Sequence, residues 1–343
     1  MRKQKILVTG GTGYIGSHTV VELIAAGFDV IIADSLVNSN REVLDAINQI
    51  SKANVAFVEM DFCHEESVEN LFQLHPDFDA IIHFAAFKAV GESVEKPLLY
   101  YRNNLFSLVN LLEKCNKYKI ENIIFSSSCT VYGNPDSLPV SENAAIKLAE
   151  SPYGNTKQIG EEILRDSVKA HSLKVISLRY FNPIGAHETA LIGELPLGVP
   201  NNLVPFITQT AIGLREKVTV FGNDYKTIDG SCVRDYIHVV DIAKAHVIAC
   251  QRLIAKKNKE NYEVFNLGTG RGNSVLEVIK TFEKVSGLPL NYTIGARRSG
   301  DVEQVYADTK LANNELGWVA ERDLENMLST SWAWEKSIST KNK

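Results

Sequence analysis

A short β-rich run, KILVT, opens the chain and leads directly into a glycine-rich turn and a helix-like segment. Gly10, Gly13 and Gly16 are spaced G-x-x-G-x-x-G across this turn. Glycines let the backbone approach a ligand closely, and a helix N-terminus favours an anion such as a pyrophosphate. An ordinary strand-to-helix turn is the simpler alternative. The order of strand, turn and helix favours a dinucleotide-binding fold.

The second apolar run, DVIIAD, ends at Asp34, about twenty residues beyond the turn. A carboxylate at this position suits the two ribose hydroxyls of NAD and would repel the 2′-phosphate of NADP. The sequence therefore predicts NAD as the cofactor.

Further β-rich runs, NVAFVEMD, DAIIHFAA, NIIFSSS and KVISLRY, alternate with helix-like segments. Such alternation predicts a parallel sheet covered on both faces. The predicted fold class is α/β: a Rossmann-type doubly wound parallel sheet with a smaller mixed α/β C-terminal domain. The stretch PIGAHETALIGELPLGVPNN has little periodicity and predicts a long functional loop. We expect one domain over residues 1–182 and a second over 183–343, with later segments, such as 234–255, packing back on the first.

The composition excludes several classes of protein. A formal net charge of -5 gives no reason to expect a nucleic-acid partner. No stretch approaches the ~20 apolar residues of a membrane span, and the opening apolar run is too short for a signal peptide. The five cysteines are an odd number at wide spacings without a CxxC, which predicts neither disulfides nor a metal site. A reducing cytoplasm fits this cysteine pattern best.

The stretch SPYGNTK places Tyr153 and Lys157 four residues apart, on one face if the segment is helical. A cation beside a phenol lowers the pKa of the phenol, so this pair could transfer protons. A chance pair on a helix surface is the alternative.

The glycine spacing together with Tyr153 and Lys157 resembles the short-chain dehydrogenase/reductase superfamily in its extended form. That superfamily has a serine or threonine at the end of its fifth strand, where this sequence reads FSSSCTVYG. By resemblance, Ser128 and Thr130 are the candidates, and Ser128 would donate to the substrate oxygen while Tyr153 exchanges its proton. A helix cap or turn is the alternative for a serine-rich strand end.

Motifs along almost the whole chain narrow the resemblance to the UDP-glucose 4-epimerases. They include IHFAAFKAVGES, LRYFNPIGAH, PNNLVPF, FGNDYKTIDG, VRDYIHVVD and FNLGTGRGNSV. The resemblance implies reversible interconversion of UDP-glucose and UDP-galactose through a 4-keto sugar. It also implies tightly bound NAD that takes and returns the hydride without being consumed. Relatives are commonly homodimers, for which helices over 98–118 and 158–170 could form the interface.

The resemblance carries over two sets of site residues. On the cofactor side it implies Gly10, Gly13, Tyr14, Ile15, Gly16, Asp34, Asn38, Asp61, Phe62, Phe84, Ala85, Lys88, Asn103, Ser128, Tyr153, Lys157 and Tyr180. On the substrate side it implies Lys88, Ser128, Tyr153, Asn182, Asn202, Leu203, Phe221, Arg234, Arg298, Asp301 and Val305. Surface ion pairing is the alternative for the two arginines.

Val305 occupies a position that, by resemblance, lines the sugar pocket. Epimerases restricted to glucose and galactose carry tyrosine there, and those that also accept N-acetylated hexosamines carry a small residue. We therefore expect interconversion of UDP-GlcNAc and UDP-GalNAc as well.

Three alternatives remain open. Sugar-nucleotide 4,6-dehydratases resemble this family but carry an Asp-Glu pair just after the strand-end Ser/Thr. Cys129, Thr130 and Val131 occupy that stretch here, which disfavours elimination of water. A reductase of the same fold is the second alternative, and a non-catalytic NAD-sensing protein is the third.

Overall fold

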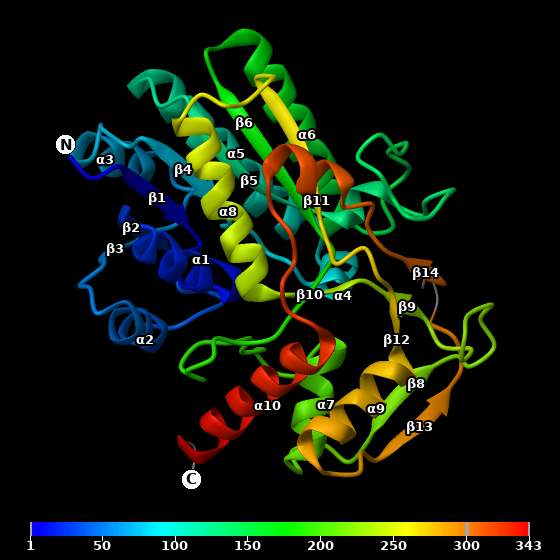
Figure 1. Cartoon of the computed structure of the whole chain (residues 1–343). Helices are drawn as coiled ribbons and strands as arrows, with labels where there is room; N and C mark the ends of the chain where they lie inside the picture. Colours follow the sequence, from blue (N-terminus) through cyan, green and yellow to red (C-terminus); the bar gives the residue numbers. More distant parts are fainter. Residues whose placement is uncertain (1, 299–301, 342–343) are drawn as a thin grey trace.

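A seven-stranded parallel sheet forms the centre of the computed structural model, which describes residues 2–298 and 302–341 (Figure 1). Its strands lie in the order β11-β6-β5-β4-β1-β2-β3. They are β1 (Lys5–Thr9), β2 (Asp29–Asp34), β3 (Ala56–Glu59), β4 (Ala80–His83), β5 (Asn122–Ser128), β6 (Lys174–Tyr180) and β11 (Tyr262–Leu267). Every neighbouring pair is parallel, which confirms the predicted fold class.

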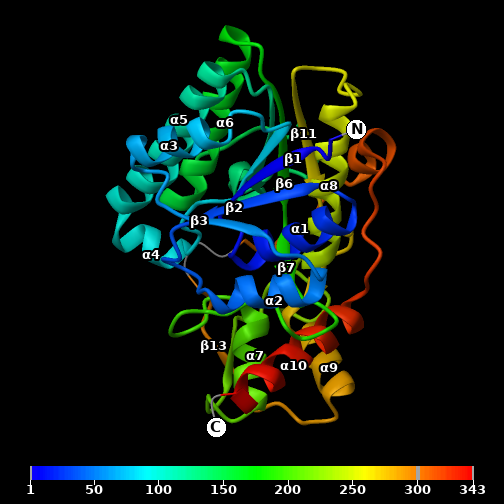
Figure 2. The same ribbon diagram turned by 90° about the vertical axis from the view of Figure 1, so that its left-hand side faces the viewer.

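Helices cover both faces of this sheet (Figure 2). One face carries α1 (Tyr14–Ala25), α2 (Glu42–Ser51) and α8 (Val239–Ile254), and the other carries α3 (Glu65–Leu74), α5 (Pro97–Tyr118) and α6 (Pro152–Ala170). Side chains alternate between the faces along a strand, so Ile6 and Val8 of β1 enter one core while Leu7 enters the other. Burial on both faces explains why the strands read as continuous apolar runs.

A smaller body lies beyond the carboxyl ends of the strands (Figure 1). Its helices are α7 (Leu203–Ala211), α9 (Val275–Ser286) and α10 (Leu324–Lys341). Its short strands form three small sheets: β7 (Asn182–Ile184) with β10 (Tyr236–His238), β8 (Val218–Phe221) with β13 (Tyr292–Gly295), and β12 (Asn273–Ser274) with β9 (Val233–Arg234) and β14 (Gln304–Val305). A separate apolar core that includes Ile207, Phe282 and Trp332 holds this body together.

The chain passes between the two bodies several times. α8 returns to cover the large sheet, and β11 adds its outermost strand beside β6. The sequence analysis predicts that the segment 234–255 packs back on the first domain. It does not predict that β11 also returns to the large sheet. The domain boundary at residue 182 therefore stays a prediction. Two elements that follow this residue, α8 and β11, pack on the large sheet. Among the described residues, no helix is both long and apolar enough to cross a bilayer.

Candidate active site

The glycine-rich turn is packed so tightly that side chains are excluded from two of its positions. Gly10 has φ +68°, and a Cβ atom there would lie 2.8 Å from the backbone nitrogen of Ala85. A Cβ atom on Gly16 would lie 2.2 Å from the carbonyl oxygen of Gly10. Gly13 caps α1 without a side chain, so the first N–H groups of that helix face the turn. This arrangement fits a pyrophosphate.

Asp34 ends β2 beside the turn. Its carboxylate accepts hydrogen bonds from the backbone nitrogens of Thr12 (3.1 Å) and Leu36 (3.0 Å), which fix its orientation. A fixed carboxylate at this edge suits ribose hydroxyls and disfavours a phosphate, so the residues fit the cofactor that the sequence predicts.

Most other residues predicted on the cofactor side lie along the same edge, where the parallel strands end. They are Asn38 after β2, Asp61 and Phe62 after β3, Phe84 and Ala85 after β4, and Tyr180 at the end of β6, while Tyr14 and Ile15 begin α1. Asn103 lies on α5, and its carbonyl oxygen is 3.5 Å from the Cys63 sulfur after β3.

α6 begins where the sequence predicts a proton-transfer pair. Ser151 caps the helix by accepting a hydrogen bond from the Gly154 nitrogen (3.1 Å), and proline follows at the first helical position. Tyr153 therefore lies in the first turn and Lys157 one turn later. The Lys157 Nζ lies 5.9 Å from the centre of the Tyr153 ring and donates a hydrogen bond to the carbonyl oxygen of Ser126 (2.6 Å).

Burial dominates the pKa values of both groups. It raises the pKa of Tyr153 to about 12, against a smaller lowering from its hydrogen bond with Ser128. It lowers the pKa of Lys157 to about 8, and the nearby Glu161 carboxylate partly opposes this. The pKa of Tyr153 is therefore raised, not lowered as the Tyr153–Lys157 pair predicts, because burial disfavours the charged phenolate.

The end of β5 meets the first turn of α6. The Ser128 hydroxyl is buried and accepts a hydrogen bond from the backbone nitrogen of Thr130 (3.2 Å), which caps the short 3₁₀ helix η1 (Cys129–Tyr132). A Cβ atom on Gly154 would lie 3.4 Å from the Thr130 Cβ, so the two segments touch. The Thr130 hydroxyl is buried and has no hydrogen-bond partner among the described residues. The structure thus brings Ser128, Thr130, Tyr153 and Lys157 together.

A buried ion pair behind this group was missed in the sequence. Arg179 of β6 donates to both carboxylate oxygens of Glu161, and the Ser127 hydroxyl donates to the same carboxylate (2.6 Å). The Arg179 guanidinium also donates to the Tyr132 hydroxyl (2.9 Å). The network ties α6 and β6 to the strand that carries Ser128. Its one sequence signal is that Glu161 follows Lys157 by four residues.

The predicted substrate residues lie on the smaller body or face it. In the β9–β14 pair, Val305 is opposite Arg234, and Val305 also packs against a small cluster that contains Phe181 and Tyr132. Arg298 is exposed and its guanidinium lies 4.9 Å from the centre of the Phe221 ring. Asp301 lies outside the described residues.

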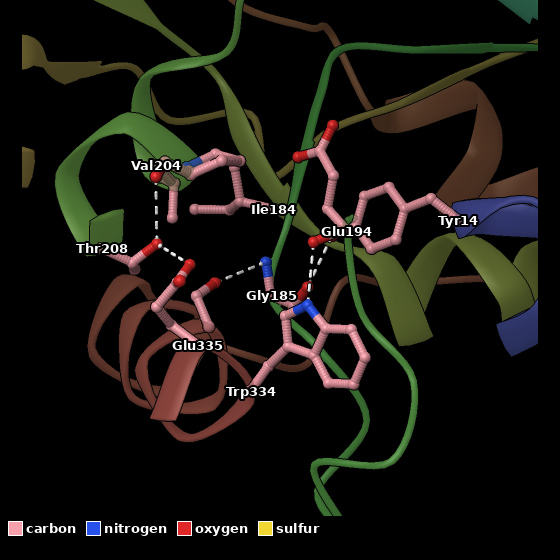
Figure 3. Close-up of a pocket in the computed structure, with 10 residues that line it drawn as sticks. Tyr14, Ile184, Gly185, Glu194, Val204, Thr208, Trp334 and Glu335 are labelled. Atoms are coloured by element: carbon pink, nitrogen blue, oxygen red, sulfur yellow. Dashed lines mark hydrogen bonds between the residues drawn. The ribbon is translucent and has the colours of Figure 1, made fainter. Parts of the chain in front are cut away.

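The remaining predicted residues lie where the two bodies meet. Asn182 begins β7, Asn202 precedes α7, and Leu203 begins that helix. Lys88, which follows β4, forms an ion pair with Glu194 (3.1 Å), a residue that the sequence did not suggest. Figure 3 shows Glu194 beside Tyr14, Gly185 and Trp334 around one small cavity. The Tyr14 hydroxyl donates to the Gly185 carbonyl oxygen (2.6 Å), which joins the glycine-rich turn to the smaller body.

Comparison with known proteins agrees with this geometry. The family model described as GDP-mannose 4,6 dehydratase matches residues 7–331. A curated relative from Bacillus subtilis, named UDP-glucose 4-epimerase, is 49% identical over 333 residues and covers 97% of each chain. The human protein of that name is 47% identical over 340 residues, with 97% of each chain covered.

Two solved structures resemble this chain over almost its whole length. The UDP-glucose-4-epimerase from Stenotrophomonas maltophila, with bound NAD and formylated UDP-arabinopyranose, is 46% identical with a TM-score of 0.95, and covers 98% of this chain and 99% of its own. The UDP-glucose 4-epimerase from Bifidobacterium longum, in complex with NAD+ and UDP, is 46% identical with a TM-score of 0.92, covering 97% and 98%. Fold and site thus define an extended short-chain dehydrogenase/reductase. Within that class, the chain belongs to the UDP-glucose 4-epimerase family.

Proposed function

We propose that this enzyme interconverts UDP-glucose and UDP-galactose by inverting C4 of the hexose, with NAD as a tightly bound cofactor that is not consumed. The main support for this proposal is the identity of the residues that follow Ser128. The 3₁₀ helix η1 reads Cys-Thr-Val-Tyr, so it offers a hydroxyl but no carboxylate beside Tyr153. Without an acid/base pair for elimination, a 4-keto sugar can only return to an alcohol.

NAD supplies a hydride acceptor and donor at C4 when it is bound. Gly10, Gly13 and Gly16 would hold its pyrophosphate and Asp34 the adenosine ribose. On this proposal Tyr153 takes the proton of the 4-hydroxyl and later returns it, while the Ser128 hydroxyl orients that oxygen. Lys157 supplies positive charge that favours the phenolate form of Tyr153.

Inversion further requires that the sugar turn over while the rest of the substrate stays in place. A ketone carbon is planar, so the turned sugar presents its opposite face and becomes the epimer. Binding energy from the UDP moiety would hold the molecule during this turn. We assign that role to Asn182, Asn202, Leu203, Phe221, Arg234 and Arg298, and Asp301 stays a predicted member of the set.

We also propose activity on the N-acetylated pair, UDP-GlcNAc and UDP-GalNAc. Val305 is half-buried against the cluster that contains Phe181, next to the segment that follows Ser128. A valine there leaves more room than a tyrosine for an acetamido group on the turning sugar.

We further propose that the protein is a homodimer and that it works in a reducing cytoplasm. α5 exposes a stripe of apolar side chains: Leu98, Leu99, Phe106 and Val109. An exposed stripe of this kind is typical of an interface, and α6 packs beside it. None of the five cysteines, all of which lie within the described residues, forms a disulfide, which supports the proposal of a reducing compartment.

Proton NMR of the anomeric region tests the proposed reaction. Purified protein without added nucleotide is incubated with equal amounts of UDP-galactose and UDP-GalNAc. We expect both gluco-epimers to appear. If only UDP-glucose appears, the protein is an epimerase that does not act on the N-acetylated substrates. A 4-keto-6-deoxy product would instead identify a dehydratase, the activity in the description of the matching family model. Net oxidation or reduction would identify a reductase. No turnover even with added NAD would favour an NAD-sensing protein.

A further inference from the structure

One carboxylate oxygen of Glu194 connects the two sides of the site. Its Oε1 accepts a hydrogen bond from the Lys88 Nζ at 3.1 Å and another from the Asn202 Nδ2 at 2.7 Å. The Glu194 side chain is only 12% exposed, so solvent screens its charge less than that of a surface carboxylate.

The Lys88 side of this bridge lies beside the glycine-rich turn. The Lys88 ammonium is 5.5 Å from the centre of the Tyr14 ring, and Tyr14 is the first residue of α1, directly after the turn. The orientation of Lys88 therefore bears on whatever anion that turn holds.

The Asn202 side lies at the start of α7. Asn202 is the N-cap residue, yet its side chain makes no capping bond, because its amide is turned toward Glu194. The first turn of α7 contains no acidic residue. Neither the Asn202 side chain nor an acidic side chain of that turn caps the backbone N–H groups of Leu203 and Val204, and a group of the nucleotide sugar could accept from them.

The backbone of Glu194 is fixed by α10. The Trp334 Nε1 donates to the Glu194 carbonyl oxygen at 2.8 Å, and a Cβ atom on Gly193 would lie 2.5 Å from the indole ring (Figure 3). The carboxylate thus projects from a supported segment, which allows it to orient two partners at once.

We propose that Glu194 is a positioning residue that couples retention of the cofactor to binding of the UDP-sugar, an inference that rests on the proposed function. It orients Lys88 at the glycine-rich turn and Asn202 at the α7 N-terminus through the same oxygen. A change on one side therefore alters the geometry on the other, which is the physical content of coupling between two sites.

The test uses the holoenzyme as purified and the Glu194→Gln variant, which keeps the shape of the side chain and removes its charge. The dissociation constant of UDP is measured by titration calorimetry, and the NAD retained after extended dialysis is measured by absorbance. We expect UDP to bind about fivefold more weakly and NAD to be lost several times faster. The effect on UDP should fall below about twofold in an Asn202→Ala background, and the effect on NAD should disappear in a Lys88→Met background.

Glu188→Gln is the matched control, because Glu188 is an exposed glutamate in the same loop. It should change neither quantity. Equal effects of Glu194→Gln with and without Asn202 and Lys88 would overturn the inference, as would a variant that behaves like wild type. If the wild-type protein binds no UDP, the proposed function itself is wrong and the inference falls with it.

Discussion

The cofactor edge and the UDP side differ in how firmly the protein holds their residues. At the cofactor edge, Lys157 is 5% exposed and is anchored to a strand carbonyl, and the glycine-rich turn has no room for a side chain at Gly10 or Gly16. On the UDP side, Phe221 is 40% exposed and Arg298 lies on the surface. On the proposed function, this difference means that the reacting groups are preorganised, whereas the residues assigned to UDP binding can adapt as the substrate enters and turns.

The largest effect on NAD binding is expected for Gly16→Ala, which tests the cofactor edge. The added methyl group meets a backbone oxygen that cannot move aside, so overpacking should cost about 1–3 kcal/mol and open the turn. The purified variant should contain almost no NAD by absorbance. Gly91→Ala is the control, because a Cβ atom there meets nothing within 4 Å. Normal NAD content in Gly16→Ala would contradict the proposed role of the glycine-rich turn in binding the pyrophosphate of NAD.

Tyr153→Phe should lower kcat by about 10³, since a positioned proton-transfer group contributes 10²–10⁴. The dissociation constant of UDP should stay within about twofold, because the residues proposed to bind UDP lie on the other side of the site. Kinetics and calorimetry on one preparation measure both. Tyr262→Phe, which removes a hydroxyl at the opposite end of the sheet, should leave kcat unchanged.

Lys157→Met should lower kcat by about 10² through loss of charge near Tyr153. It should also change how stability depends on pH. Burial lowers the pKa of Lys157 to about 8, so above that pH the folded protein binds fewer protons at this site than the unfolded chain does. The free energy of unfolding of the wild type should therefore rise, relative to the variant, from pH about 8 to about 10.5.

Urea unfolding of both proteins across that pH range measures the difference. Lys169→Met is the control, because Lys169 is an exposed lysine on the same helix. A difference between wild type and Lys157→Met that does not change with pH would show that the Lys157 ammonium is not destabilised by burial.

Val305→Tyr should reduce turnover of UDP-GalNAc by more than about tenfold and that of UDP-galactose by less than about threefold, because only the larger sugar needs the space. Competition between the two substrates, followed by NMR, measures the ratio directly. Val319→Tyr, at an exposed position, is the control. An equal loss for both sugars would mean that Val305 does not select between them.

The smallest effect is expected for Phe221→Ala on the UDP side. The exposed ring and its contact with Arg298 should contribute about 0.5–1 kcal/mol to UDP binding, or about a threefold change in the dissociation constant. NAD content should be unchanged. Leu214→Ala, also at an exposed apolar position, is the control. If Phe221→Ala released NAD, the contrast between the two sides would be lost.

Local patterns predicted most of the fold, and they pointed to candidate site residues that the structure brings together at the ends of the strands. The glycine spacing, the apolar strands and the four-residue separation of Tyr153 and Lys157 are visible within a few neighbouring residues. Two features depend on distant contacts and could not be foreseen. Glu194 meets Lys88 only in the folded chain, and β11 gives no local sign that it pairs with β6. The pKa of Tyr153 was mispredicted because burial is a property of the whole fold.

The position of β11 has a consequence for synthesis of the chain on the ribosome. β6 is complete at Tyr180, but its outer edge has no partner until Leu267 has been made. Until then the nascent sheet ends in a long apolar edge, the kind of surface that pairs with other chains. We therefore expect a fragment that stops at residue 182 to aggregate, and translation between residues 181 and 267 to be the interval in which the growing protein most needs a chaperone.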